Sequence, residues 1–504
     1  MPFDTGTATD KINLLDKLRD FITSQHVATA AVSNGGTGYT AGDILTASGG
    51  TFFTAATFEV LTVSSGVITA LRIVKNGAYT SNPSSPVNTT GGTGTGATVT
   101  VTFASTGWTV QRESQEALSA TVQAGGTGYA VNDILTVVGG TFTTAGQFKV
   151  TAVSGGVVTT VTLQTKGSYQ IIPANPVTTT GGGGTGCTLN VTWQAQNQAG
   201  VEKEMIFKGV GSGSDEIYVG IRTYVMSSNH LWELAGMTGY QAASTFSTQP
   251  GISGGRHNLT EDGHYVPLAN STITYFFFVN GRRIICVFKI GTTYTSMYLG
   301  WLDPFATPAE YPYPMMVNAG NSDPTPLFTP TPIPNSGILD PMGHVSNPVN
   351  GPCSIRDPGG NWRQFRNGDQ SGSARNEENE AVLYPAGEPD RTTGVLAVDQ
   401  GASGTHQQSD FIPNVGVPGT QTYNLWPTPH TPSNISPLWP VMAIECVPDR
   451  MVMGEMSDTY WVSAQGESTN LVAEDQVTVG NDVYLVFPQA NRTDIWAHFA
   501  VKRA

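Results

Sequence analysis

The sequence contains one long internal repeat. Residues 30–103 and 120–193 align without a gap at an offset of 90 residues, and 39 of the 74 aligned positions are identical. With only two copies, the repeat is a tandem pair of small modules and not a solenoid. The fold of the remaining chain must therefore accommodate two small folded units near its N-terminal end.

The segments that the two copies share predict short β-strands joined by tight turns. In the first copy they are GGTGY, DILT, GGTF and GGTGTG, which begin at Gly35, Asp43, Gly49 and Gly91. Residues 98–103 alternate polar and apolar side chains with the period of two that a half-buried strand requires. Shared glycines such as Gly66 are typical of turns with positive φ. Each copy is therefore predicted to be a small β-sandwich-like module.

The composition of the whole chain favours β-structure with many turns. Charged residues make up 12% of the 504 residues, about half of the usual share. Thr, Val and Tyr suit half-buried pleated surfaces, and the 59 Gly and 31 Pro are typical of turns. With 9% aromatic residues, the composition is not that of a disordered chain. We therefore predict an all-β, multi-domain protein with a β-sandwich-like main domain.

Residues 9–25 are the one segment with a clear helical pattern. Apolar side chains recur there at helical spacing and form a stripe of Ile12, Leu14, Leu15, Leu18, Phe21 and Ile22. We interpret the segment as a docking or oligomerisation helix. Its candidate interface residues are Leu14, Leu18 and Phe21.

The order of the patterns along the chain predicts a main β domain that carries both modules as insertions. Residues 274–279 and 284–288 flank Asn280-Gly281, a strong hairpin signal. Residues 105–118 are unlike either repeat, and we expect them to share a core with the chain from residue 200 onward, since loop tips tolerate insertions. The predicted parts are an N-terminal helix and lead-in (1–29), module 1 (30–103), a connecting strand of the main domain (104–119), module 2 (120–193), the main β domain (194–320), Pro- and Gly-rich loops and strands (321–470), and the C-terminal strands of the main domain (471–504).

The charge of the chain argues against two classes of partner. The formal net charge is −14 at pH 7. A nucleic-acid-binding surface needs Lys and Arg to displace the counterions around phosphates, and anionic membranes attract basic segments. The longest apolar runs, such as 275–279, are also far shorter than a bilayer-spanning helix. We therefore expect no nucleic-acid partner and no membrane insertion.

The cysteines and the first residues bear on where the protein is made. Cys187, Cys286, Cys353 and Cys446 are scattered and form no CxxC pair, which predicts neither a zinc site nor a disulfide framework. Such cysteines fit synthesis in a reducing cytoplasm. Residues 1–4 do not begin a basic and apolar leader, so we expect no signal peptide.

A glycine motif in the second repeat resembles a dinucleotide-binding loop. Gly181, Gly183 and Gly186 satisfy GxGxxG. A dinucleotide site requires a helix after this loop, whereas residues 188–193 are predicted to form a strand. The motif is therefore interpreted as a turn.

A second cluster contains side chains of the kinds that bind metals. His257, Glu261, Asp262 and His264 lie close together in the sequence. Their spacing matches no zinc or calcium pattern, which favours a polar loop. A metal on a trimer axis, built from one such His per subunit, is the alternative.

A third cluster contains the carboxylates that sugar hydrolysis uses in pairs. Glu377, Glu378 and Glu380 lie in one charge run. A glycosidase needs two carboxylates about 5–10 Å apart across a cleft, whereas neighbours in a charge run are usually solvated. We expect no catalytic residues, no metal site and no cofactor, and hence a protein that is not an enzyme.

Residues 311–316 form an aromatic and apolar segment stiffened by two prolines. A stiff segment loses little entropy when it is fixed, which suits a protein interface. The alternative is that the segment covers the chain's own core. Tyr311, Tyr313, Met315 and Met316 are the candidate interface residues.

The repeat unit GGTGY, DILT, GGTF and GGTGTG resembles small β modules found in virion proteins of tailed bacteriophages. The main domain resembles a family of phage virion structural proteins at residues 107–112, 217–224, 278–289, 296–316 and 484–503. The resemblance implies a virion component of the tail or baseplate region, assembled in the host cytoplasm with other virion proteins as partners. It implies no catalytic or binding residues.

Three functions are compatible with these observations. The first, which we predict, is structural assembly in the tail, baseplate or collar, through strand edges, proline-rich loops and apolar patches, with a homo-oligomeric state. The second is a carbohydrate- or receptor-binding adhesin whose modules bind host surface glycans through exposed aromatic faces. The third is a surface-polysaccharide hydrolase.

Overall fold

The computed structural model describes most of the chain. The residues that it describes are 1–113, 115–195, 201–211, 216–226, 229–242, 244–253, 264–319, 353–364, 381–385, 399–400, 406–407, 438–445, 451–463, 472–480, 482–488 and 497–503. They divide into two compact units, each of which is described by itself. Unit 1 comprises Met1–Thr109, Lys208–Val219 and Leu234–Ala504, and unit 2 comprises Val110–Phe207 and Gly220–Glu233.

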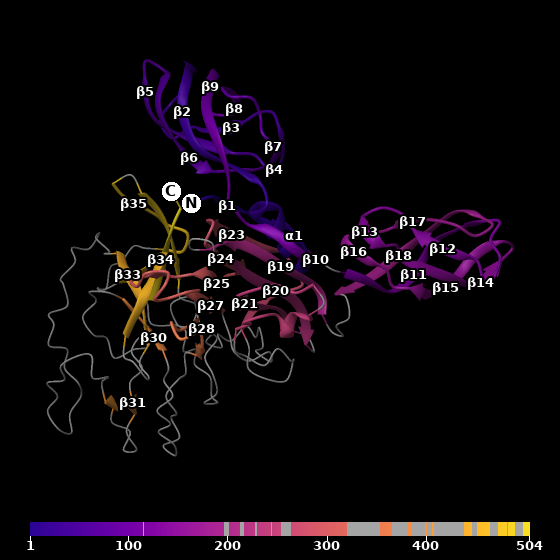
Figure 1. Cartoon of the computed structure of the whole chain (residues 1–504). Helices are drawn as coiled ribbons and strands as arrows, with labels where there is room; N and C mark the ends of the chain where they lie inside the picture. The colour runs from indigo at the N-terminus through magenta and orange to yellow at the C-terminus, as the bar shows by residue number, and fades with distance from the viewer. Residues whose placement is uncertain are drawn as a thin grey trace. The chain divides into compact units, whose positions relative to one another are not determined.

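The described residues are almost entirely β-structure, which confirms the predicted all-β class. Figure 1 shows one α-helix, α1 (Lys11–Ile22), among strands that belong to several sheets. A single turn of 3-10 helix, Phe246–Thr248, is the other helical element in this part of the chain. The abundant Gly and Thr thus serve turns and strands, as the composition predicted.

Two sheets form the main β-sandwich of unit 1. The first has the strand order β1 (Phe3–Ala8), β23 (Ile273–Val279), β24 (Arg283–Ile290), β25 (Thr293–Trp301), β27 (Met315–Asn318), β28 (Cys353–Arg356) and β29 (Trp362–Gln364). The second has the order β30 (Ala381–Pro385), β33 (Leu438–Glu445), β34 (Met451–Ser463), β37 (Ala497–Lys502), β36 (Asp482–Pro488) and β35 (Gln476–Val479), with β26 (Asp303–Pro304) paired to β34. The predicted hairpin is confirmed, because β23 and β24 pair Val279 with Ile284 across Asn280-Gly281.

The sandwich core depends on the alternation of side chains along β23. Phe276 and Phe278 face the second sheet, where their ring centres lie 5.0 and 6.2 Å from that of Phe487 on β36. Phe277 faces the other side, and its ring centre lies 5.9 Å from that of Phe21 on α1. Successive side chains of a strand point to opposite faces, so β23 contributes to two apolar layers. Each buried Phe stabilises the fold by roughly 1.5–3 kcal/mol.

Helix α1 is shorter than the predicted 9–25. Asp10 is its N-cap, and one carboxylate oxygen accepts the backbone N–H groups of Ile12 and Asn13 at 2.8 and 2.9 Å. The helix ends at Ile22, because β2 begins at Gln25. The apolar stripe ends at the same residue. The residues that the prediction added are Thr9 and the N-cap Asp10 before the helix, and Thr23, Ser24 and Gln25 after it.

Asp10→Ala is expected to lower the free energy of unfolding by about 1 kcal/mol, because two backbone N–H groups of the helix lose their acceptor. The readout is hydrogen exchange, measured by mass spectrometry on the peptide that covers α1. Lys17→Ala, in the helix interior, is the control and is expected to leave the exchange unchanged. Unaltered protection in Asp10→Ala would show that packing alone holds the helix.

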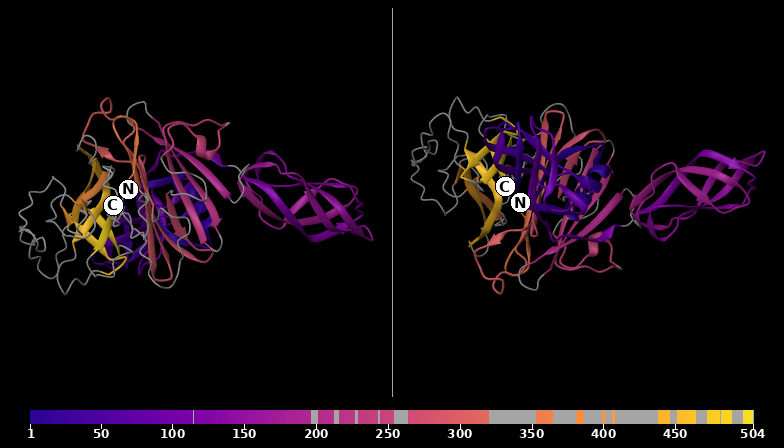
Figure 2. Two further views of the ribbon diagram at one scale, coloured as in Figure 1. Left: turned by 90° about the horizontal axis from the view of Figure 1, so that it is seen from below. Right: turned by 90° about the horizontal axis from the view of Figure 1, so that it is seen from above.

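Each module is an eight-stranded sheet, and the two sheets have the same strand order. Figures 1 and 2 draw the strands of both modules in indigo to magenta. Module 1 has the order β4 (Thr51–Thr54), β7 (Ala78–Ser81), β2 (Gln25–Thr37), β9 (Thr95–Ser105), β8 (Val87–Thr90), β3 (Ile44–Ala47), β5 (Thr57–Ser64) and β6 (Val67–Lys75). Module 2 has the order β13 (Thr141–Thr144), β16 (Ser168–Ile171), β11 (Gln115–Thr127), β18 (Thr185–Ala195), β17 (Val177–Thr180), β12 (Ile134–Val137), β14 (Gln147–Ser154) and β15 (Val157–Thr165). Each sheet curls over itself, so that β6 packs on β2 and β15 packs on β11.

Inside each curled sheet lies an apolar core. Phe58 and Phe148 occupy equivalent positions in the two cores, and both side chains are fully buried. The hydroxyl groups of Tyr79 and Tyr169 each accept a backbone N–H, at 2.9 and 2.7 Å, and burial raises the pKa of both phenols. A buried N–H without its acceptor costs about 1–3 kcal/mol. The two modules therefore have equivalent apolar and polar interiors.

The structure extends each module beyond the sequence repeat. Gln25 pairs with Ser105, and Gln115 pairs with Ala195, so the modules span 25–105 and 115–195. The residues at the roots of the modules, where each module joins the rest of the chain, differ between the two copies. Lys166 forms an ion pair with Glu116 at 2.7 Å in module 2, whereas the Asn76 side chain at the equivalent position of module 1 accepts the backbone N–H of Phe3 at 2.9 Å. The sequence repeat thus ends where the attachments of the modules differ.

A five-stranded sheet has the order β10 (Thr109–Glu113), β19 (Val201–Val210), β20 (Glu216–Met226), β21 (Asn229–Met237) and β22 (Tyr265–Leu268). Module 2 is inserted in the chain between β10 and β19, which are neighbours in this sheet. Just before β10, the indole N–H of Trp108 donates to the backbone oxygen of Asn280 at 2.6 Å. At the two ends of the predicted connecting strand, residues 104–105 belong to β9 of module 1 and residues 115–119 belong to β11 of module 2.

Two further expectations concern membranes and cysteines. In the described part of the chain, no helix combines the length and the apolar content needed to cross a membrane. Cys187, Cys286 and Cys353 are buried and free, and burial raises the pKa of each thiol. These thiols are therefore neutral and pack as small core side chains. Cys446 lies outside the described residues.

Candidate functional site

The predicted interface residues of the helix lie in the chain's own interior. Leu14, Leu18 and Phe21 are buried, and α1 packs on β1, β23 and β7 of the same unit. The helix therefore docks on its own chain. The prediction is corrected for these three side chains, because side chains buried in this way cannot contact a neighbouring subunit.

The 311–316 segment also covers the chain's own core. Tyr311, Met315 and Met316 are buried, and the Tyr311 hydroxyl donates to the backbone oxygen of Arg356. Tyr313 is partly exposed, and the centre of its ring lies 5.3 Å from the guanidinium of Arg356. The alternative that the segment covers the chain's own core is therefore right for Tyr311, Met315 and Met316. The interface interpretation is corrected for these three residues.

The glycine motif of module 2 forms a turn between two strands. Gly181 and Gly186 have φ angles of +97° and +80°, and the segment joins β17 to β18. A strand follows the motif, so no helix N-terminus faces the position of a pyrophosphate. The turn interpretation is confirmed.

The His, Asp and Glu cluster at 257–264 and the glutamate cluster at 377–380 lie mostly outside the residues that the structure describes. His264 is buried, and its Nε2 lies 2.7 Å from the hydroxyl oxygen of Ser354. His257, Glu261, Asp262, Glu377, Glu378 and Glu380 lie outside the described residues. Among the side chains that are described, no three of His, Cys, Asp or Glu are grouped so as to hold a metal ion.

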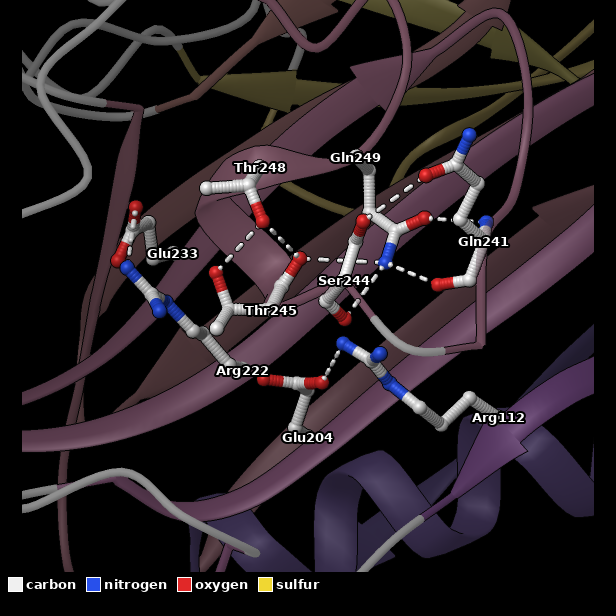
Figure 3. A network of polar contacts seen from close by, with 9 residues as sticks. All are labelled: Arg112, Glu204, Arg222, Glu233, Gln241, Ser244, Thr245, Thr248 and Gln249. Atoms are coloured by element: carbon white, nitrogen blue, oxygen red, sulfur yellow. Dashed lines mark hydrogen bonds and ion pairs between the residues drawn. The ribbon is translucent and has the colours of Figure 1, made fainter.

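Buried ion pairs cross the five-stranded sheet (Figure 3). Between β20 and β21, the guanidinium of Arg222 donates to both carboxylate oxygens of Glu233, at 2.8 and 3.1 Å. Between β10 and β19, Arg112 pairs with Glu204. The most exposed of these four side chains, Arg112, is only 13% exposed. The charges are therefore largely removed from water.

The surroundings keep the Arg222 guanidinium charged. Burial by itself lowers the pKa of Arg222, but the carboxylates of Glu233 and Glu204 outweigh burial, and the pKa is raised. The Arg222 guanidinium also lies 4.9 Å from the centre of the Tyr224 ring. Because each carboxylate is held by a guanidinium, the pairs are suited to holding strands and not to moving protons.

A further ion pair occupies the opposite face of the same sheet. Lys203 on β19 pairs with Glu113 on β10 at 2.7 Å, and both side chains are buried. Glu113 follows Arg112 and Lys203 precedes Glu204, so strand alternation places the two pairs on opposite faces. Opposite charges across neighbouring strands fix the register of β10 against β19 from both sides.

A separate polar network orders the loop that contains the 3-10 helix. The side-chain amide nitrogen of Gln249 lies 3.0 to 3.1 Å from the backbone oxygens of Gln241, Ser244 and Thr245. Its amide oxygen accepts the backbone N–H of Gln241 at 2.8 Å. The Gln249 side chain is buried and satisfies loop backbone groups that have no strand partner. Its role is therefore to hold the loop.

Each module repeats an aspartate clamp at an exposed turn. The Asp43 carboxylate accepts the backbone N–H groups of Thr40 and Thr93 at 2.9 and 3.0 Å, and the Thr93 hydroxyl at 2.7 Å. The Thr40 N–H and the Thr93 groups lower the pKa of Asp43 to about 2. In module 2 Asp133 accepts two backbone N–H groups, which also lowers its pKa. The clamp ties the loop before β3 to the glycine-rich turn before β9.

The clamp is expected to make the local stability of module 1 depend on acid pH. The folded-state pKa of Asp43 is below its unfolded value of about 3.9, so the stabilisation is complete above that value and is lost as the pH falls toward about 2. Hydrogen exchange of the Thr40 and Thr93 amides between pH 4 and pH 2 is the measurement. Asp43→Asn should remove the pH dependence, and the same dependence in this variant would contradict the assignment.

An exposed phenylalanine is duplicated on the surfaces of the two modules. Phe52 on β4 is 44% exposed, and Phe142 on β13 is 42% exposed. Each ring contacts a buried tyrosine ring, with centre-to-centre distances of 5.6 Å to Tyr79 and 5.3 Å to Tyr169. Both phenylalanines come from the shared GGTF segment, which we had interpreted only as part of a turn and strand. The repeated Phe was the signal in the sequence for this feature.

Comparison with known proteins adds no relative from which a function could be transferred. No family model matches the chain, and no curated protein matches it.

Proposed function

We propose that the chain is a structural component of a tailed-phage virion, in the tail, baseplate or collar, and that it acts through protein–protein assembly. The observation that carries the proposal is the duplication of an eight-stranded module, with one strand order at 25–105 and again at 115–195. A duplicated surface increases the number of contacts that one chain makes with its surroundings. It adds little to a reaction at a single active site. The sequence resemblance to phage virion proteins supports the same proposal.

The polar interior supports a structural role. The buried pairs Arg222–Glu233 and Lys203–Glu113 bridge neighbouring strands, and the Asp43 clamp holds a turn. Groups engaged in this way fix strand register and loop conformation, so the sheets present defined surfaces. A defined surface loses little entropy on association, which suits assembly into a particle.

The buried residues of the helix and of the 311–316 segment cannot serve as assembly contacts. Exposed apolar side chains of the main sandwich are the assembly contacts that we propose in their place. Phe305 is 60% exposed and follows β26, and its backbone N–H donates to the oxygen of Met453 at 3.4 Å on β34. Val452 on β34 is 47% exposed, and Val479 on the edge strand β35 is 54% exposed. Edge strands and exposed apolar residues are typical of contact surfaces. Other virion proteins and further copies of the chain are the proposed partners, with assembly in the host cytoplasm.

Quantitative mass spectrometry of tailed particles tests the proposal. Particles are purified through two successive density gradients from lysed cultures in which the chain is made. We expect the chain to sediment with the particles at a fixed ratio to their other proteins, while an abundant host cytosolic protein is depleted. A chain that stays at the top of both gradients as a monomer would contradict the proposal.

A further inference from the structure

The exposed phenylalanines of the modules lie on edge strands among uncharged side chains. Strands β4 and β13 stand at equivalent ends of the two strand orders. The other exposed side chains on these two strands are Thr51, Phe53, Thr141, Thr143 and Thr144. Each strand thus exposes an aromatic ring and, within one or two residues of it, hydroxyl groups that donate and accept hydrogen bonds.

Edge-to-face and tilted contacts with buried aromatic rings hold each exposed phenylalanine in place. In module 1 the ring of Tyr79 lies between Phe52 and Phe103, with centre-to-centre distances of 5.6 and 5.3 Å. In module 2 the ring of Tyr169 lies between Phe142 and Trp193, at 5.3 and 4.7 Å. An exposed ring that is already held from below loses little freedom when a ligand covers it.

The charges of module 1 are engaged within the chain. Its repeat, residues 30–103, has four charged residues, of which Asp43 forms the turn clamp and Glu59 pairs with Arg72 at 2.8 Å. The fourth, Lys75, lies 3.6 Å from the carboxylate of Asp4. Glu59 and Arg72 lie on β5 and β6, at the other end of the strand order from β4. The Lys75–Asp4 pair lies near Thr54 on β4, but its two charges face each other and Asp4 is buried. The surface around Phe52 is therefore poorly suited to selecting a ligand by charge.

Module 2 has the same character. Its repeat, residues 120–193, has three charged residues. Asp133 forms the second turn clamp, and Lys166 pairs with Glu116 at 2.7 Å. Lys149 lies on β14, which is separated from β13 in the strand order. Both modules therefore present their exposed phenylalanine on a surface of low charge.

We propose that Phe52 and Phe142 are the stacking platforms of two equivalent binding sites for an uncharged polysaccharide. The negative face of a phenyl ring attracts the polarised C–H groups on the apolar face of a sugar ring, and threonine hydroxyls match sugar hydroxyls. A protein interface needs a contiguous apolar patch of several hundred Å². On its own strand Phe142 has only threonines beside it, and the exposed apolar neighbours of the two phenylalanines are single side chains, Ile171 on β16 and Phe53 on β4. Two equal sites in one chain suit a polymer that repeats its own unit.

Affinity electrophoresis of the full chain tests this inference. Native gels are cast with uncharged polysaccharides (dextran, galactomannan and xyloglucan) and, in parallel, with the anionic polymers alginate and hyaluronan. We expect at least one uncharged polymer to retard the chain, and the anionic polymers to leave its mobility unchanged. Phe52→Ala and Phe142→Ala should each weaken binding about tenfold, which corresponds to about 1.4 kcal/mol of binding free energy. The double variant should abolish the retardation.

Leu61→Ala is the matched control, because Leu61 is 42% exposed in module 1 but lies on β5, away from β4 in the strand order. It should retain full retardation, and circular dichroism of all variants checks that they fold. No retardation in any uncharged gel, retention by the anionic gels alone, or unchanged binding in the double variant would overturn the inference. Loss of self-association in the double variant without polysaccharide binding would overturn it in favour of a second copy as the partner. This inference goes beyond the proposed function. Because gel retardation and sedimentation with particles are separate measurements, the polysaccharide sites can be disproved while the structural role in the virion stands.

Discussion

Glu233→Ala is expected to lower the free energy of unfolding of the five-stranded sheet by about 3–5 kcal/mol, because it leaves a buried guanidinium without its partner. Arg222 and Glu233 are 3% and 1% exposed, and the guanidinium donates to both carboxylate oxygens. Of the attractions that outweigh the cost of burying Arg222, the one to Glu233 is the largest. Without Glu233, the guanidinium loses two hydrogen bonds while it remains buried between β20 and β21.

Hydrogen exchange of the peptides that cover 216–226 and 229–237 measures this loss directly. The double variant Arg222→Met/Glu233→Leu removes both charges and should keep protection within about 1 kcal/mol of the wild type, since apolar replacement of a whole buried pair is often neutral. Glu216→Ala breaks the exposed pair with Lys208, and its exchange should match that of the wild type. Equal protection in Glu233→Ala and Glu216→Ala would contradict the structural role of the buried pair.

Phe58→Ala is expected to destabilise module 1 by about 3–5 kcal/mol, because it leaves a large cavity in a small core. The Phe58 side chain is fully buried, and Phe148 occupies the equivalent position in module 2. Each core is enclosed by its own eight-stranded sheet. The loss of protection should therefore be confined to residues 25–105 in Phe58→Ala and to 115–195 in Phe148→Ala.

Hydrogen exchange of both modules in the same sample separates the two effects. Phe52→Ala is the matched control, because it removes the same side chain at a position of module 1 that is 44% exposed. Its protection should stay close to that of the wild type. If Phe58→Ala lowered protection equally in both modules, the two would fold as one cooperative unit and not as separate ones.

The parts of the fold that depend on local signals could be predicted from the sequence. The repeat predicted two equal modules, Asn280-Gly281 predicted the hairpin of β23 and β24, and the strand after Gly186 excluded a dinucleotide loop. The ends of the modules could not be predicted from the repeat. A sequence repeat extends only as far as the two copies have similar residues, and the residues at the two attachment points differ. Lys166 at one root forms an ion pair where Asn76 at the other binds the backbone of β1.

The candidate interface was mostly misplaced, for a physical reason. The stripe of Leu14, Leu18 and Phe21 shows that one face of a helix is buried, but it carries no information about which chain covers that face. The same holds for Met316, which lies in the core between the sheets of the sandwich. The buried pairs were missed because a pair such as Lys203–Glu113 becomes visible only once the strand register is known.

A cryo-electron microscopy map of the intact tailed particle tests the central claim most directly. The account predicts density into which the β-sandwich and both eight-stranded modules fit, in several symmetry-related copies and in contact with neighbouring subunits. A map whose density is fully accounted for by other proteins, together with a purified chain that is a lone monomer, would contradict it.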